Sequence, residues 1–123
     1  MNIAITTAGS TLDSTVFCEF AKTPYLLIVN VDTMACTSIA HTCKAGSDEE
    51  LARTIVKHRC EAVITVKVSG EAFEVLADDG VTRYAAADMS ARAALVAMER
   101  RELEFIRNPD GLNTCFGHHR HCH

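Results

Sequence analysis

The fold is decided by residues 25–43, which read Tyr-Leu-Leu-Ile-Val-Asn-Val-Asp-Thr-Met-Ala-Cys-Thr-Ser-Ile-Ala-His-Thr-Cys. The near-continuous apolar run at 25–31 is typical of a strand buried on both faces. Asp32 and Thr33 leave room only for a tight turn, so residues 35–43 are expected to form a strand antiparallel to the first. The chain therefore contains an antiparallel strand pair around which its other elements can be placed.

Strands and helices follow one another on either side of this pair. Upstream, residues 2–7 are β-branched and predict a strand, and a long loop then runs to about Pro24. Downstream, Ser47-Asp-Glu-Glu50 is a capping box that opens a helix ending near Arg59. The later predicted elements are a strand at 62–68, a helix capped by Ser69, a strand at 81–85, a helix capped by Ser90 and a short strand at 103–106.

This order of elements predicts the topology. A three-stranded antiparallel meander followed by right-handed crossovers gives an α/β, three-layer fold, with a five-stranded mixed sheet in the order 3-2-1-4-5 and helices on both faces. Strands 1, 3, 4 and 5 then run in one direction. Their carboxyl ends, the long loop and the amino ends of the helices are expected at one edge, where open α/β sheets bind ligands.

Composition limits the classes of partner. The chain has 123 residues, with 16 acidic and 12 basic side chains and a net charge of −4, which argues against nucleic acid or an anionic membrane as partner. No apolar run approaches the roughly 18 residues of a membrane span, and the start lacks a signal-peptide pattern, so a cytoplasmic protein is expected. In a reducing compartment the six cysteines are expected to be free thiols or metal ligands.

Several side chains are expected to border the ligand edge. His41 and Cys43 share one face of their predicted strand and could bind one metal ion, although a hydrogen-bonded histidine beside a small buried thiol is the simpler alternative. Thiols, an imidazole and ammonium groups together suit a soft, anionic, metal-containing ligand better than a nucleotide. The candidates from this reasoning are Cys18, Lys22, His41, Cys43, Lys44 and Lys67.

The end of the chain is a second candidate site. Asn108-Pro-Asp-Gly111 marks a turn, so residues 1–107 are expected to form the domain and 108–123 a Cys/His-rich tail. Thiolate and imidazole donors favour Zn, Cu, Ni or iron-sulfur species. A tail that binds metal adventitiously, or a cloning remnant, is the alternative. The predicted metal ligands are Cys115, His118, His119, His121, Cys122 and His123.

The sequence resembles the dinitrogenase iron-molybdenum cofactor biosynthesis family over nearly all of residues 1–106. The residues that carry the resemblance are Asp13-Ser14, Phe20-Ala-Lys-Thr-Pro-Tyr25-Leu-Leu-Ile-Val, Ala62-Val-Ile-Thr65, Glu71-Ala-Phe-Glu-Val-Leu76 and Asp79-Gly80-Val81. The resemblance implies a ribonuclease H-like fold in a small accessory protein that binds or carries molybdenum- or iron-sulfur clusters. It also adds Phe20 to the candidates at the edge, because Phe20-Ala21-Lys22 stands where the family usually has Phe-Gly-Arg. Val66 and Cys60 stand where the family commonly has glycine.

The leading hypothesis is non-catalytic binding, storage or delivery of a molybdenum-, iron- or copper-sulfur cluster, or its precursor, in metallocofactor assembly. The alternative is a Zn, Ni or Cu metallochaperone or metal store that acts through the tail. No enzyme activity is expected, because residues 2–7 lack the carboxylate that two-metal nuclease chemistry needs on its central strand, and no thiol pair has redox spacing. The expected partners are proteins that donate or accept the cluster, and the chain is expected to be a monomer or weak dimer.

Overall fold

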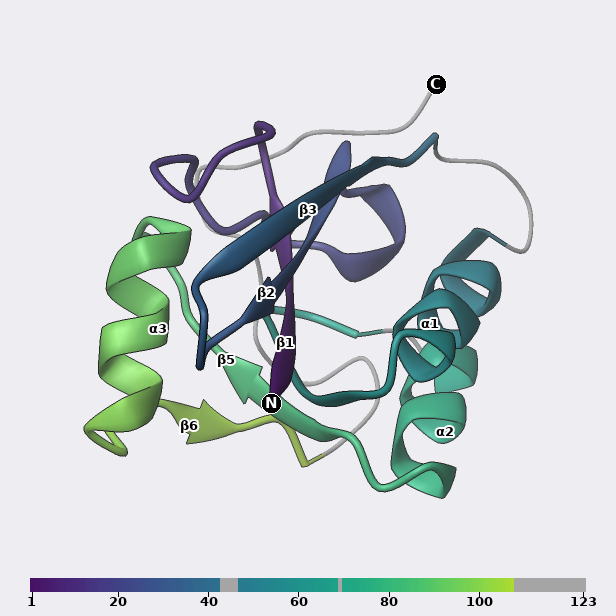
Figure 1. Ribbon diagram of the computed structural model, residues 1–123. Helices are drawn as coiled ribbons and strands as arrows, with labels where there is room; N and C mark the ends of the chain where they lie inside the picture. Colours follow the sequence, from purple (N-terminus) through teal and green to yellow (C-terminus); the bar gives the residue numbers. More distant parts are fainter. Residues whose placement is uncertain (43–46, 69, 108–123) are drawn as a thin grey trace.

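A six-stranded mixed sheet runs through the centre of the protein (Figure 1). The structure is a computed structural model that describes residues 1–42, 47–68 and 70–107. Its strands are β1 (Asn2–Thr7), β2 (Tyr25–Asn30), β3 (Ala35–Ala40), β4 (Cys60–Thr65), β5 (Thr82–Ala85) and β6 (Glu104–Phe105). Its helices are α1 (Ser47–Lys57), α2 (Gly70–Asp78), α3 (Ala91–Glu99) and the short 3-10 helix η1 (Phe20–Lys22).

The strand order is β3-β2-β1-β4-β5-β6, which confirms the predicted order for the first five strands. β1 and β2 pair antiparallel, as do β2 and β3, while β1, β4 and β5 are parallel neighbours. The short strand predicted at residues 103–106 is confirmed as β6, but the predicted five-stranded sheet is wrong, because β6 joins it as a sixth strand, antiparallel to β5. Two apolar contacts hold this short strand: the rings of Tyr84 and Phe105 stack with centroids 5.2 Å apart, and Ile106 is buried in the core.

Several elements end earlier than the sequence predicts. β3 stops at Ala40 rather than at residue 43, and the amide of His41 donates to the carbonyl of Pro24 at 2.9 Å. α1 stops at Lys57, because the backbone turns into the left-handed region at Arg59, where φ is 55°. β4 stops at Thr65, so Lys67 is free to pair with the long loop. α2 ends at Asp78, and Gly80 then takes a left-handed conformation with φ of 76°, which glycine allows at the end of a helix.

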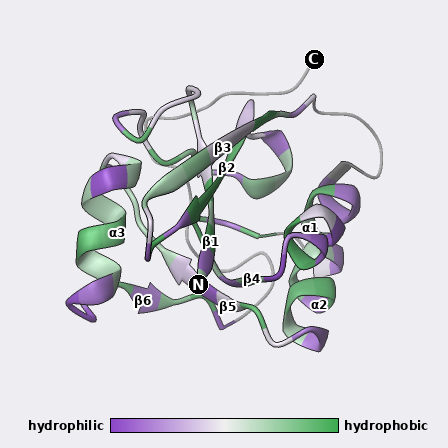
Figure 2. Ribbon diagram, viewed as in Figure 1, coloured by the Kyte–Doolittle hydropathy of each residue, from purple (hydrophilic) through white to green (hydrophobic). Residues whose placement is uncertain are grey.

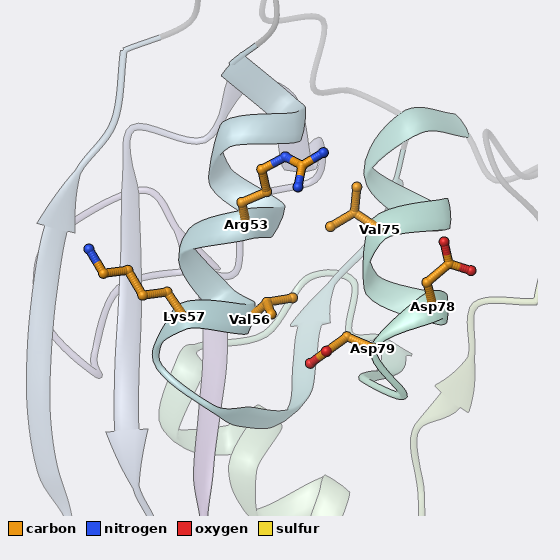
Figure 3. Close-up of a pocket in the computed structure, with 6 residues that line it drawn as sticks. All are labelled: Arg53, Val56, Lys57, Val75, Asp78 and Asp79. Carbon is orange, nitrogen blue, oxygen red and sulfur yellow. The ribbon is translucent and has the colours of Figure 1, made fainter.

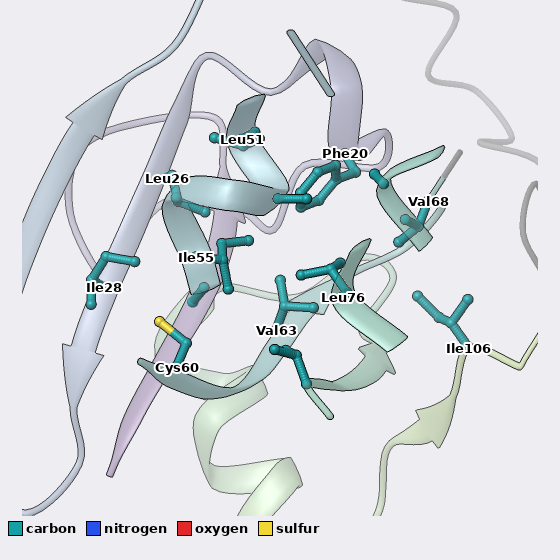
Figure 4. Close-up of a cluster of buried hydrophobic side chains, with 14 residues drawn as sticks. Phe20, Leu26, Ile28, Leu51, Ile55, Cys60, Val63, Val68, Leu76 and Ile106 are labelled. Carbon is teal, nitrogen blue, oxygen red and sulfur yellow. The ribbon is translucent and has the colours of Figure 1, made fainter. Parts of the chain in front are cut away.

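The hydrophobic core has two halves, one on each face of the sheet. α1 and α2 cover one face, where Phe20, Leu26, Ile55, Val63 and Leu76 are among the packed side chains (Figure 4). The cluster on the α3 face includes Ile3, Ile5, Leu27, Ile64 and Leu95. Each helix carries both hydrophobic and hydrophilic residues, as expected for helices with one face on a sheet (Figure 2). The predicted three-layer α/β class is therefore confirmed. None of the helices in the described ranges is long and apolar enough to cross a membrane.

Candidate functional site

Backbone hydrogen bonds join the long loop to the segment that follows β4. The amide of Phe20 donates to the carbonyl of Lys67 at 2.9 Å, and the amide of Lys67 donates to the carbonyl of Cys18 at 3.0 Å. This pairing is a short parallel bridge centred on Glu19 and Lys67. Two predicted site residues, Cys18 and Lys67, therefore lie on paired backbone segments at the carboxyl end of β4.

Lys22 lies on the same loop but already has an acidic partner. Its Nζ is 3.4 Å from Oε2 of Glu19, and these two side chains are only 29% and 27% exposed. The carboxylate therefore offsets most of the positive charge of Lys22 at short range. Lys67, also half-buried, forms no ion pair with any residue that the structure describes. Of the two lysines, Lys67 is the one whose charge is available to an anionic ligand.

Phe20 does not have the role that was predicted for it. Its ring has no exposed surface and packs in the core between the sheet and α1 (Figure 4). A side chain in that position cannot touch a ligand at the surface, so its assignment as a direct ligand contact is wrong. Burial of an aromatic ring in the core stabilises the fold, whereas exposure of the same ring to water does not. Phe20 instead anchors η1 and, with it, the backbone that pairs with Lys67.

His41 is held in a defined orientation by the loop. Its Nδ1 is 2.8 Å from the carbonyl oxygen of Thr23. A carbonyl can only accept, so Nδ1 carries the proton and Nε2 of the neutral ring has a free lone pair. This atom is buried and has no hydrogen-bond partner among the residues that the structure describes. Metal-binding histidines are commonly oriented in this way by a carbonyl on the other ring nitrogen. Cys43 and Lys44 lie outside the described residues, so the predicted pairing of His41 with Cys43 stays a prediction.

Four buried threonines form the floor of this region, and the sequence analysis did not single them out. They are Thr6, Thr7, Thr23 and Thr65. The hydroxyls of Thr6 and Thr65 are 2.7 Å apart, and that of Thr6 is also 3.1 Å from the carbonyl oxygen of Phe17. The hydroxyl of Thr23 donates to the carbonyl oxygen of Tyr25 at 2.8 Å and lies 3.1 Å from the carbonyl oxygen of Thr7.

These hydroxyls tie the ends of β1 and β4 to the loop. Only Thr6 and Thr7 lie at the end of a predicted strand, because the second strand was predicted to continue to residue 68 and Thr23 to lie in the loop. No carboxylate is present in β1 or β4 except Glu61, which is exposed near the opposite end of β4. The two strand ends therefore supply neutral hydroxyl groups rather than ligands for divalent cations.

Metal ligands do not cluster in the part of the chain that the structure describes. Within it, no group of three or more His, Cys, Asp or Glu side chains could hold a metal ion. The six predicted ligands in the tail, Cys115, His118, His119, His121, Cys122 and His123, lie outside the described residues. The described residues of the sheet edge therefore offer charge, hydrogen bonds and at most one or two thiol or imidazole groups.

A shallow groove lies elsewhere on the surface, between the last turns of α1 and α2 (Figure 3). Its volume is about 430 Å³. One wall carries cationic and the other anionic side chains, so the groove has no net preference for an anion. Its lining residues are Arg53, Val56, Lys57, Val75, Asp78 and Asp79. Because the groove is at the carboxyl ends of the helices, it is separate from the edge that holds Cys18 and Lys67.

Residues 1–101 match the family described as "Dinitrogenase iron-molybdenum cofactor". The chain belongs to the dinitrogenase iron-molybdenum cofactor family. This assignment confirms the resemblance noted in the sequence and connects the protein with the binding or assembly of that cofactor. No protein of curated function matches the sequence.

Solved structures share the fold. The apo form of the orange protein from Desulfovibrio gigas superposes with a TM-score of 0.82 at 22% identity, covering 89% of this chain and 96% of that one. A Thermotoga protein provisionally assigned as NifB gives 0.78 at 24% identity, with coverage of 89% and 98%. A Methanocaldococcus jannaschii protein provisionally named a dinitrogenase gives 0.66 at 22% identity, with coverage of 89% and 97%. At these identities the likeness establishes the fold alone.

Proposed function

We propose that this family member binds, stores or delivers a molybdenum-, iron- or copper-sulfur cluster, or its precursor, at the edge formed by the loop and the carboxyl end of β4. The observation that carries the proposal is the backbone pairing of Cys18 with Lys67. It brings the loop segment that carries the half-buried thiol of Cys18 beside the segment of Lys67, whose ammonium group has no ion-pair partner among the described residues, immediately before the amino end of α2. Such a mixture of groups suits a soft, anionic cargo.

The electrostatics of the edge support an anionic cargo. Sulfide-bridged clusters carry negative charge, which the ammonium group of Lys67 and the backbone amides at the start of α2 would stabilise. α2 has a single acidic residue, Glu71, in its first turn, whereas α1 has three there. The amino end of α2 therefore keeps more of its favourable potential for an external anion.

Soft ligands would complete the binding. Cys18 can supply a thiolate, and the oriented ring of His41 can supply Nε2 if the side chains around it open. No reaction step is needed, so the proposed role is that of a carrier rather than an enzyme. Cluster donor and acceptor proteins are its expected partners, and the cytoplasm, where free thiols persist, is its expected compartment.

Anaerobic reconstitution tests this role. The full chain and a chain truncated after Asn113 would be incubated with tetrathiomolybdate and Cu(I), and separately with ferrous iron and sulfide. Metal content and visible absorption after desalting would measure uptake. Retention of a chromophoric cluster by the truncated chain is expected, because its edge is intact.

Two matched pairs of variants locate the site. Lys67→Gln is compared with Lys57→Gln, which removes the same charge from the exposed end of α1, and Cys18→Ser is compared with Cys36→Ser, which removes an exposed thiol from β3. Weaker binding only in the first member of each pair is expected. Complete loss of cluster uptake by the chain truncated after Asn113 would contradict a site at the sheet edge. It would support the alternative, a Zn, Ni or Cu store in the tail.

A further inference from the structure

β3 forms an open edge of the sheet. Its only strand neighbour in the described sheet is β2, with which it pairs in unbroken register from Ala35 opposite Asn30 to Ala40 opposite Tyr25. Every residue of β3 is exposed except Ile39, which is half-buried. Figure 1 shows the outer side of β3 uncovered by any of the described helices. The strand therefore presents a row of backbone amides and carbonyls that can pair with another strand.

This edge lacks the features that usually prevent such pairing. Natural edge strands are commonly short, bulged, or interrupted by lysine or proline. β3 has six residues, Ala-Cys-Thr-Ser-Ile-Ala, without a charge, a proline or a register shift. The opposite edge strand, β6, has only two residues. The two edges of the sheet are thus unequal, and β3 is the one that is suited to adding a strand.

We propose that β3 pairs antiparallel with β3 of a second copy of this chain, so that the two sheets become one. A two-fold axis brings identical segments together, and any charge in the strand would then face the same charge. β3 is neutral throughout and its side chains are small, so it is compatible with itself. A basic or acidic peptide would gain no complementary charge from this strand, which favours a second copy as the occupant.

The symmetry restricts the register. A two-fold axis perpendicular to the sheet places one residue opposite its own equivalent, and the centre of β3 offers Thr37 or Ser38. With Thr37 at the axis, Cys36 lies opposite Ser38 of the second copy. With Ser38 at the axis, Ser38 lies opposite itself and Cys36 lies opposite Ala40. Every facing pair within the strand is uncharged in either register, so neither is excluded by repulsion.

The contact is small, because each copy contributes a single strand. Interfaces of standard size bury at least about 1,200 Å², and a pair of six-residue strands buries less, so we expect a weak dimer with a dissociation constant on the order of 100 μM. Antiparallel pairing points the carboxyl ends of the two β1 strands in opposite directions. Both edges that carry Cys18 and Lys67 then stay accessible, and the dimer does not depend on the proposed cluster binding.

Sedimentation equilibrium of the metal-free full chain tests the proposal, with a thiol reductant present and protein concentrations from about 10 μM to about 1 mM. The double variant Thr37→Lys/Ser38→Lys places like charges across the axis and is expected to raise the dissociation constant about tenfold or more. The matched control Ala93→Lys/Val96→Lys adds the same charge to exposed positions on α3 and is expected to dimerise like the unmodified chain. An unmodified chain that stays monomeric up to about 1 mM overturns the proposal. So does a β3 variant that dimerises as well as the control.

A cross-linking measurement keeps the test decisive if the lysine variant folds poorly. In Ser38→Cys, oxidised glutathione is expected to convert two thiols of facing strands into an intermolecular disulfide, while it is itself reduced to two molecules of glutathione. Peptide mapping should find the introduced thiol linked to Cys36 if Thr37 is at the axis, and linked to its own equivalent if Ser38 is. A chain that links only through Cys115 or Cys122, or not at all, contradicts pairing through β3. The same variants can be loaded with cluster separately, so failure of the dimer and failure of cluster binding are distinguishable.

Discussion

Truncation of Phe20 to alanine is expected to destabilise the whole domain, because its ring is a core side chain at the base of η1. The ring is fully buried. A phenylalanine side chain buries at least about 150 Å², and at roughly 25 cal/mol per Å² that area is worth about 4 kcal/mol. Measured Phe→Ala substitutions in cores cost about 3–5 kcal/mol, which is a large fraction of the stability of a small domain.

Urea denaturation followed by circular dichroism gives the free energy of unfolding of the variant. Phe105→Ala is the control, because that ring is 52% exposed, and it is expected to cost well under half as much. Phe20→Leu keeps an apolar side chain in the same space and is expected to lose about 1–2 kcal/mol while still binding the cluster. A loss below about 1 kcal/mol for Phe20→Ala would refute the assignment of this ring to the core. Full stability with lost cluster binding in Phe20→Leu would restore Phe20 as a ligand contact.

Three further substitutions or treatments test other features. Lys67→Gln should weaken binding of an anionic cluster about five- to tenfold by equilibrium titration, whereas Lys57→Gln should change it less than about twofold. Arg59→Gly should raise the free energy of unfolding by about 1 kcal/mol, because φ there is 55°, and Arg59→Ala should give no gain, which separates backbone conformation from charge. Burial raises the pKa of the Cys60 thiol to about 11, so iodoacetamide should label it more slowly than half-buried Cys18. The labelling rate of Cys60 should rise about tenfold per pH unit up to that pKa. Equally fast labelling of Cys18 and Cys60 in the folded protein at pH 8 would contradict the slow reaction expected for Cys60.

The sheet order could be predicted because it depends on local signals. The short connection between β2 and β3, at residues 31–34, requires antiparallel pairing, and the capping residues mark where helices return the chain for parallel pairing. Ser90 shows this directly, since its hydroxyl accepts from the amide of Ala93 at 3.1 Å. Such signals involve only a few neighbouring residues, so they can be recognised in the sequence without knowledge of the tertiary structure.

The features that were missed depend on contacts between distant segments. The short strand at residues 103–106 was predicted, but its place in the sheet was not, because its pairing with β5 depends on the ring of Tyr84 and on burial of Ile106. Phe20 was assigned to the ligand site because its position in the loop is visible in the sequence, whereas the cavity that it fills is created by α1 and the sheet together. The pairing of Lys67 with the loop likewise depends on the residue at which β4 ends, and the ends of such elements are difficult to predict from sequence.

The threonine pair at the ends of β1 and β4 has a consequence for how proteins of this architecture can diverge. Thr6 and Thr65 satisfy each other beneath the loop, without ionisable groups. The sheet therefore imposes no charge on whatever lies above it, and the charge and the soft ligands of the proposed binding edge depend on Lys67 and Cys18. Under the proposed function, a relative could bind a different cargo through substitutions at those half-buried positions, while the buried hydroxyls and the packing below them stayed the same.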